Sequence, residues 1–313
     1  MPDWQLRTPV AFILFNRPDV TERVFTEIAK AKPHKLLVIG DGPRANRAGE
    51  AGKVAETRQI LERIDWDCAV LTNFSDINLG CKRRVSGGLD WVFEQTPEAI
   101  ILEDDCVPHP SFFRFCEEML ERYRDDRRVM QINGANFQSG FRAGNQDSYY
   151  FSKLCHVWGW ASWRDRWQSY YDVSMAAWPR VRDERRVADL VGSDEETKYW
   201  LPIFQDVFDG KIDTWDFQWA FACMLEGGSA VAPSVNLVSN IGFGAGATHT
   251  TGGRNRLANL PTEPMRFPLR HPAGMFQSRS LDRRFFRRFS SASWRSRITT
   301  RLRRHIHESS TAK

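Results

Sequence analysis

The sequence predicts an α/β fold in which a mostly parallel sheet is covered by flanking helices. Through the first 105 residues, short apolar runs alternate with stretches whose apolar residues recur at helical spacing. This rhythm is typical of parallel sheets, because two parallel strands need a crossover connection, usually a helix. The composition, with 42% hydrophobic and 27% charged residues, is ordinary for a soluble globular protein.

The first half contains four predicted strands with three helices between them. The strands are the apolar runs at residues 10–15, 36–39, 68–71 and 99–102. Apolar residues at spacings of three and four predict the helices between them. The three helical series are Val20, Val24, Phe25 and Ile28, then Val54, Ile60, Leu61 and Ile64, then Val85, Leu89 and Val92.

The second half is less regular. We expect strands at residues 129–132 and 148–151, helices at 181–191 and 195–208, and a mobile glycine-rich loop at 242–246. We divide the chain into residues 1–128 and 129–255, two halves of one domain, and a C-terminal extension at 256–313. No apolar run approaches the ~20 residues of a membrane-spanning helix, and the first eight residues do not resemble a signal peptide.

Polar residues follow each of the four predicted strands. They are Asn16 and Arg17, then Asp41, then Asn78, then the triplet Glu103, Asp104 and Asp105. Ligands of open α/β sheets bind beyond the carboxyl ends of the strands, where these side chains are expected to meet. The sequence therefore predicts a binding site at this edge of the sheet.

The acidic triplet indicates a divalent metal. Three consecutive carboxylates repel one another, and a hard cation such as Mn²⁺ or Mg²⁺ compensates for their charge and prefers oxygen ligands. The cation also allows a negative phosphate to bind beside the carboxylates. The alternative interpretation is a solvated acidic turn before Pro108 and Pro110.

The same residues carry a resemblance to a known family. The run Ala99-Ile-Ile-Leu-Glu-Asp-Asp105 and the Pro-Ser-Phe-Phe run from Pro110 resemble the variant DxD region of GT-A nucleotide-sugar transferases. The likeness is strongest to the N-acetylglucosaminyltransferase I type and to related bacterial transferases. Phe15-Asn-Arg-Pro18 and Asp41 also match, and the likeness covers roughly residues 8 to 250.

This resemblance implies a GT-A architecture, the Rossmann-like fold of nucleotide-diphospho-sugar transferases, and a UDP-sugar donor. It places Asn16, Arg17 and Asp41 around the nucleotide. By the same analogy, Asp105 binds the metal, Asp104 the ribose and Glu103 the donor sugar. Residues 1–128 then form the nucleotide-sugar-binding half and residues 129–255 the acceptor-binding and catalytic half.

Asp216 is the candidate catalytic base. An inverting transfer needs a carboxylate that removes the proton of the acceptor hydroxyl. The candidates in the second half are Asp206, Asp209, Asp213 and Asp216. Asp216 lies between aromatic residues in Thr-Trp215-Asp-Phe-Gln-Trp219. Such surroundings desolvate a carboxylate and raise its pKa. The segment also matches the family's Trp-Asp motif. The alternative is a helix-capping Asp with Trp215 and Trp219 in the core.

Five of the twelve tryptophans lie within residues 158–178. Indole rings pack on the C–H faces of sugars and offer an N–H to a hydroxyl. We expect Trp158 or Trp160 to form a wall of the donor or acceptor pocket, and we place Trp215 at the donor. Packing in the core is the alternative for each of them.

Two weaker signals concern phosphate and metal. Arg83 lies in Lys82-Arg-Arg84 at a predicted helix start, where cations and free amides suit phosphate. His249 follows the loop at 242–246 and is a second candidate metal ligand. We expect the loop to close over the donor. A solvated basic turn and an uninvolved histidine are the alternatives.

The positive charge is concentrated at the C-terminus. Residues 279–313 carry eleven Lys/Arg and two acidic residues, so the preceding residues sum to about −4. Arginines interspersed with aromatic and aliphatic residues predict basic amphipathic helices that suit an anionic membrane surface. A partner-binding tail is the alternative. An acidic body without a nucleic-acid motif argues against nucleic acid. Six scattered cysteines without zinc spacing indicate a cytoplasmic protein. The basic tail would bind it peripherally to the inner face of the membrane.

The leading hypothesis is a metal-dependent inverting glycosyltransferase. It would move a sugar from a nucleotide diphosphate, most simply a UDP-sugar, to a glycan or lipid-linked acceptor in the synthesis of a cell-envelope glycan. A nucleotidyltransferase shares the fold and metal but ordinarily carries a basic glycine-rich loop after the first strand. The segment Asn16-Arg-Pro-Asp19 does not supply that loop. A non-catalytic sugar- or membrane-binding module is the third hypothesis.

Overall fold

The computed structural model describes residues 4–141, 146–243 and 257–288. Its strands are β1 Val10–Leu14, β2 Lys35–Gly40, β3 Ala69–Phe74, β4 Glu98–Glu103, β5 Cys106–Pro108, β6 Val129–Asn133, β7 Tyr149–Ser152, β8 Trp160–Trp163, β9 Ser229–Pro233 and β10 Val238–Asn240. Its helices are α1 Pro18–Ala31, α2 Glu50–Gln59, the 3₁₀ helix η1 Ile60–Arg63, α3 Gly80–Gln95, α4 Ser111–Tyr123, α5 Arg164–Tyr170, α6 Trp178–Asp183, α7 Val187–Val191, α8 Asp194–Phe208 and α9 Asp216–Leu225. Residues 279–288 form a further helix.

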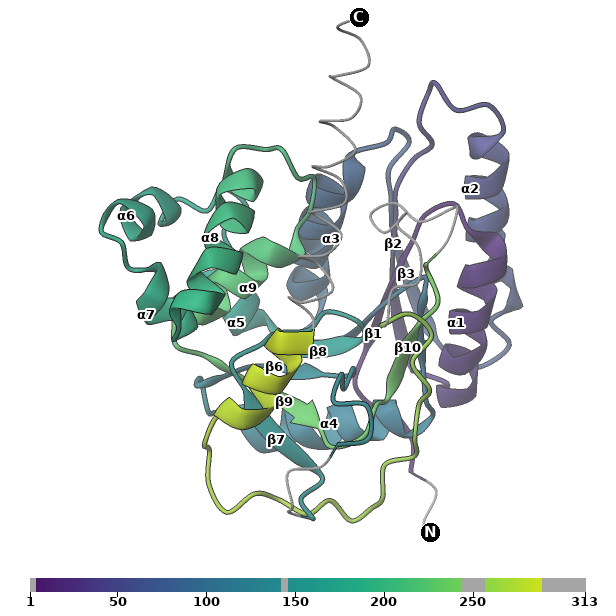
Figure 1. The fold of residues 1–313 in the computed structure, drawn as a ribbon. Coiled ribbons are helices and arrows are strands. Elements are labelled where there is room, and N and C mark those ends of the chain that lie inside the picture. Colours follow the sequence, from purple (N-terminus) through teal and green to yellow (C-terminus); the bar gives the residue numbers. More distant parts are fainter. Residues whose placement is uncertain (1–3, 142–145, 244–256, 289–313) are drawn as a thin grey trace, which may run out of the picture.

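One eight-stranded sheet runs through the molecule in the order β3-β2-β1-β4-β8-β6-β9-β7 (Figure 1). Strands β3, β2, β1 and β4 are mutually parallel, and β6 pairs in parallel with β9. Only β8 and β7 pair antiparallel to their neighbours in this sheet. The predicted α/β class with a mostly parallel sheet is therefore confirmed. A separate two-stranded sheet joins β5 to β10.

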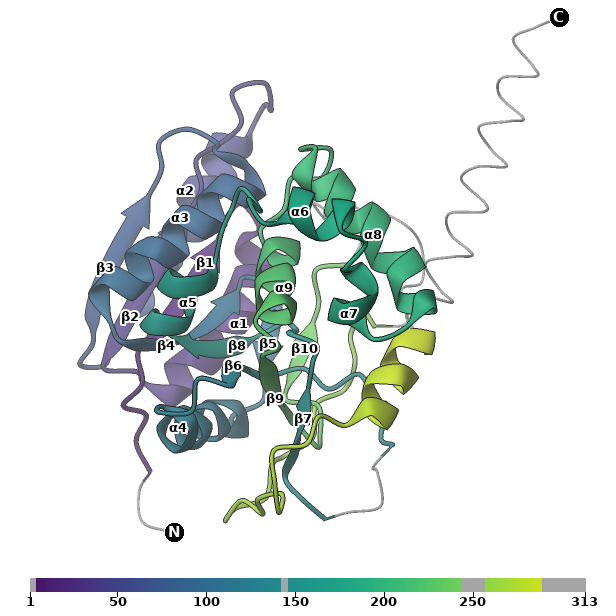
Figure 2. The ribbon, with the colours of Figure 1, turned by 90° about the vertical axis from the view of Figure 1, so that its left-hand side faces the viewer.

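Helices cover both faces of the sheet (Figure 2), and each face has its own core. On one face, α1 and α4 pack on alternate residues of the strands, such as Phe12 and Leu102. On the other face, α3, α5 and α9 cover the opposite residues, such as Ile13 and Ile101. A third cluster lies among α6, α7, α8 and α9. The strands read as continuous apolar runs because both of their faces are buried.

The predicted helix at residues 181–191 is two helices in the structure. The chain turns between α6 and α7 at Arg185, which has a positive φ of 57°. The arginines between the two helices leave no continuous apolar stripe across the turn, and the periodic residues Val181, Val187 and Val191 still reach one core. The helix predicted at residues 195–208 is confirmed as α8, which continues through Pro202.

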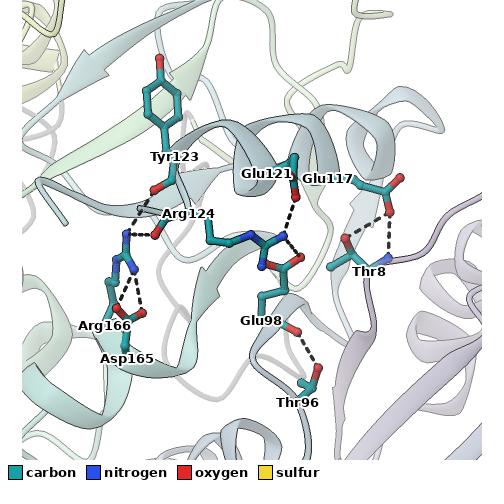
Figure 3. A network of polar contacts seen from close by, with 9 residues as sticks. All are labelled: Thr8, Thr96, Glu98, Glu117, Glu121, Tyr123, Arg124, Asp165 and Arg166. Atoms are coloured by element: carbon teal, nitrogen blue, oxygen red, sulfur yellow. Dashed lines mark hydrogen bonds and ion pairs between the residues drawn. The ribbon is translucent and has the colours of Figure 1, made fainter. Parts of the chain in front are cut away.

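A polar network fastens the sheet edge opposite the acidic triplet (Figure 3). Arg124, just after α4, donates to Glu98 at 2.7 Å and to Glu121 at 2.6 Å. Arg166 is 2% exposed and donates to the carbonyl oxygens of Tyr123 and Arg124 at 3.1 and 2.7 Å. Because it joins the start of β4 to α4 and α5, this network holds the strand that ends at the acidic triplet.

No helix within the described ranges combines the length and the hydrophobicity that a bilayer crossing requires. The six cysteines are free thiols. The helix at residues 279–288 lies against the second half of the domain. Asp282 accepts from the Ser152 hydroxyl of β7, and Phe286 packs on Tyr199 of α8 with ring centroids 5.4 Å apart.

Candidate functional site

The acidic triplet lies at the carboxyl end of β4 and faces the start of α1. Arg17, which precedes α1, donates from one nitrogen to Asp104 and, at 2.9 Å, to Asp105. Asp104 is 4% exposed, so this guanidinium compensates for a charge that is shielded from water. This geometry agrees with the sequence prediction that Arg17 and the triplet lie at the same edge of the sheet.

Burial and mutual repulsion keep a proton on Glu103 at neutral pH. Burial, together with the charges of Asp105, Asp104 and Asp216, raises the pKa of Glu103 to about 8. Burial also raises the pKa of Asp104 to about 6, against the lowering effect of Arg17. Burial lowers the pKa of Arg17, but the two aspartates outweigh it and raise that pKa above its usual range. With Glu103 protonated, the carboxylates of the cluster still carry one more charge than Arg17 compensates.

Glu103, Asp105 and Cys106 place three potential ligand atoms within 4.8 Å of one another. Two of these ligands are carboxylates, which suit a hard cation such as Mn²⁺ or Mg²⁺. Burial raises the pKa of the Cys106 thiol well above its usual value, so the sulfur stays protonated and is a poor ligand for such an ion. The residues present therefore fit a cation held by Glu103 and Asp105, with substrate oxygens completing the shell.

The strand β10 supports Asp105 from the other side. The Asn240 side chain donates to Asp105 at 3.1 Å, and the Ile241 amide donates to its backbone carbonyl at 2.9 Å. A Cβ at Gly242 would lie 1.9 Å from the Asp105 carboxylate. Only glycine therefore fits at this position, which brings the segment after β10 directly onto the metal-binding group.

Asp41, after β2, holds the loop that leads into α3. Its carboxylate accepts from the amides of Gly42, Leu79 and Gly80 at 2.9, 2.9 and 3.1 Å, and from the Asn78 side chain at 2.9 Å. Burial raises its pKa, while these hydrogen bonds oppose the rise. Asp41 thus lies in the predicted crevice and organises it.

The start of α3 is already occupied by a carboxylate. Asp213 accepts from the amides of Cys81 and Lys82 at 3.0 and 3.2 Å, which are the free donors that a phosphate would use. Arg83 is exposed on the first turn, and Arg84 is buried against Asn73 at 2.7 Å. Arg83 is therefore available as a cation, but not beside free helix amides.

Asn16 and Asp216 each form hydrogen bonds that hold their side chains. The Asn16 amide donates to Glu50 at 2.9 Å, and Glu50 is ion-paired with Arg44, which lowers the pKa of Glu50 to about 2. Asp216 is the first residue of α9 and accepts from Thr214 and, at 3.0 Å, from the Phe217 amide. Its charge contributes to the raised pKa of Glu103, so the two carboxylates lie near enough to repel each other.

The three tryptophans of the sequence prediction have different positions. Trp158 is half-buried and packs on Phe137 and Phe243 with ring centroids 5.1 and 5.5 Å apart. Trp160 and Trp215 are 0% and 2% exposed and stack on each other in the core. These two indoles offer no surface to a ligand, which corrects their placement at the donor. They are buried because α9 packs its start against β8.

His249 lies outside the described residues, as does most of the loop predicted at residues 242–246. Sequence reasoning missed two residues that the structure brings to this edge, Glu50 and Asn240. Asp213 was among the candidate bases, and in the structure its carboxylate accepts from the first amides of α3. Asn240 has no local sequence signal, since its role depends on pairing between two strands distant in the sequence.

The chain matches no protein-family model and no curated protein sequence. Among solved structures, it is similar to UDP-glucose pyrophosphorylase complexed with UDP-glucose, with a TM-score of 0.33 and 7% sequence identity. The match covers 72% of this chain and 90% of that chain. A likeness of this degree carries no argument about ligands, so the function rests on the geometry of the chain's own residues.

Proposed function

We propose that this protein is a metal-dependent inverting glycosyltransferase that uses a nucleoside diphosphate sugar, with a UDP-sugar as the first candidate. The observation that carries the proposal is the convergence of Glu103, Asp105 and Asp216 at one sheet edge, with Arg17 bound to the triplet. Two carboxylates for a cation and a third facing them are the elements that diphosphate-leaving sugar transfer needs.

In this proposal, Glu103 and Asp105 hold Mn²⁺ or Mg²⁺, which supplies positive charge for the diphosphate. Arg17 pairs with Asp104 and Asp105, next to the proposed cation, and would contact the phosphates. Asp104 is buried and fixed by Arg17, which suits the ribose role that the family resemblance gives it. Asp41 orders the loop at Asn78 to Gly80, against which the nucleoside would lie.

Asp216 is the proposed base. Its carboxylate would accept the proton of an acceptor hydroxyl as the hydroxyl oxygen bonds to the anomeric carbon. The bond from that carbon to the diphosphate oxygen breaks, and the nucleoside diphosphate leaves with the electron pair. Its hydrogen bonds from Thr214 and the Phe217 amide fix the carboxylate in place without neutralising it. The acceptor is a glycan or a lipid-linked sugar.

The products distinguish this proposal from its enzymatic alternative. A glycosyltransferase releases UDP from a UDP-sugar, whereas a nucleotidyltransferase breaks the bond between the two phosphates and, with pyrophosphate as the acceptor, yields UTP and a sugar 1-phosphate. We expect UDP-glucose, UDP-galactose or UDP-N-acetylglucosamine to give UDP slowly with water as acceptor, in Mn²⁺ and not in chelator. Formation of UTP and a sugar 1-phosphate when pyrophosphate is supplied would contradict glycosyl transfer.

We further propose that the C-terminal helix contacts an anionic membrane surface. Arg279, Arg283 and Arg287 are exposed and four residues apart, so they lie on one face of the helix at residues 279–288. Arginines on one face suit anionic headgroups. Co-sedimentation with phosphatidylglycerol vesicles, lost when all three become Ala, would support this. Equal binding to phosphatidylcholine vesicles would contradict it.

A further inference from the structure

A chain of aromatic rings leads away from the metal-binding group. Phe243 follows Gly242, whose Cα leaves no room for a side chain beside Asp105. The Phe243 ring lies 5.5 Å from Trp158, and Trp158 lies 5.1 Å from Phe137, in both pairs at steep angles. Beyond them, His156 lies 4.7 Å from both Phe137 and Phe285, the latter from the helix at residues 279–288.

These rings belong to the same sheet edge as the acidic triplet. Trp160 pairs with Ile101 of β4 and with Asn133 of β6, so the segment before β8 leaves the sheet next to the end of β4. Asn133 fixes this segment by accepting from the His156 amide at 3.2 Å and donating to the Leu154 carbonyl at 3.0 Å. The position of the rings relative to Glu103 and Asp105 is therefore set by the sheet.

The rings are not all core residues. Phe137 is 6% exposed and forms the floor, but His156, Trp158, Phe243 and Phe285 are half-buried, so each keeps some surface for a ligand. The fully enclosed indoles of Trp160 and Trp167 lie on the other face of the sheet, in a separate core. A half-buried aromatic surface beside a polar site is an arrangement that sugar C–H faces match.

His156 stands out within this surface. Within the described residues, neither nitrogen of its ring has a hydrogen-bond partner, although its backbone is bonded to Asn133 and Gln131. Burial lowers its pKa to about 3, so the ring is neutral and offers one donor and one acceptor. Because the ring is half-buried, a ligand hydroxyl can reach these nitrogens.

We propose that His156, Trp158 and Phe285 form the binding surface for a carbohydrate acceptor. The inference rests on the proposed function, which supplies the donor at Glu103 and Asp105. A sugar ring packs its C–H face on the indole and phenyl rings, and His156 hydrogen-bonds one of its hydroxyls. The helix at residues 279–288 then contributes Phe285 to the acceptor surface.

The test uses the full chain with UDP and Mn²⁺ and four probes: the methyl glycosides of glucose, galactose, mannose and N-acetylglucosamine. Saturation-transfer NMR detects which glycoside binds. We expect a saturation-transfer signal for at least one glycoside. This NMR signal should be about tenfold weaker in Trp158→Ala and in His156→Ala. The matched control is Phe276→Ala, an aromatic side chain that is 80% exposed elsewhere on the surface and should leave the signal unchanged.

Conservative variants guard against misfolding. Trp158→Phe and His156→Gln keep the packing, and both should weaken the saturation-transfer signal. The melting temperature of each variant, and its rise with UDP and Mn²⁺, should stay as in the native chain. The proposed acceptor surface is wrong if none of the four glycosides gives a saturation-transfer signal. It is also wrong if the signal is unchanged in all four variants of Trp158 and His156. Glycoside binding without any effect of UDP and Mn²⁺ on melting would instead contradict the proposed donor function and leave the sugar surface standing.

Discussion

At the scale of single residues, the site holds more carboxylates than cations. Glu103, Asp104 and Asp105 share Arg17, and the charge of Asp216 reaches Glu103 as well. The sequence alone places these residue types at strand ends, because strands and polar clusters are local patterns. It does not show that Trp160 and Trp215 are enclosed, since burial depends on α9 packing against β8.

Asp216→Asn removes the proposed base and keeps the shape of the side chain. We expect binding of UDP and Mn²⁺ to stay the same, because the amide can still accept from the Phe217 backbone. Sugar transfer should fall by about 10²–10⁴-fold, the usual contribution of a general base. Turnover of the variant at the native rate, measured as UDP release to an acceptor, would exclude Asp216 from that role.

The raised pKa of Glu103 makes the metal-free protein sensitive to pH. The folded state keeps a proton up to about pH 8, whereas the unfolded chain releases it near its ordinary value of 4.5. Between these values the folded state binds more protons, so the stability falls as the pH rises. Melting in chelator should show this decline, and Glu103→Gln should flatten it. The same slope in the variant would assign the effect to other groups.

At the scale of elements, the start of α3 joins the two halves of the domain. Asp41 holds the loop before the helix, and Asp213, from the segment that leads into α9, caps its first amides. The predicted phosphate position at this helix start is therefore taken by a carboxylate from the second half. Sequence patterns could not show this, since Asp213 is 132 residues from the amide of Cys81 that it binds.

Asp213→Ala should destabilise the protein by about 0.5–2 kcal/mol, as removal of a helix cap does. The substitution leaves two helix amides without a partner and loosens the segment that carries Asp216. Urea unfolding measures the change, with Glu94→Ala, exposed at the far end of α3, as the control. Equal midpoints for the two variants would show that the cap has no energetic role.

At the scale of the whole molecule, local patterns predicted the parallel half of the sheet and not its continuation. The four strands β3, β2, β1 and β4 follow from their apolar runs. The sequence shows strand β8 only as an aromatic segment. Residues Trp160 to Trp163 are buried on both faces, so they do not alternate between apolar and polar. Its antiparallel place between β4 and β6 depends on long-range pairing, and that place brings His156 and Trp158 to the acidic edge.

The proposed function depends on a cation and a nucleotide that bind together at Glu103 and Asp105. The direct measurement is the melting temperature with UDP and Mn²⁺ together, with each alone, and with UDP and chelator. A hundredfold excess over the dissociation constant adds about 2.7 kcal/mol to the stability. We predict a rise with UDP and Mn²⁺ together that chelator removes and that Glu103→Gln with Asp105→Asn abolishes. A rise that is the same in chelator, or in the double variant, would contradict the metal-dependent donor site.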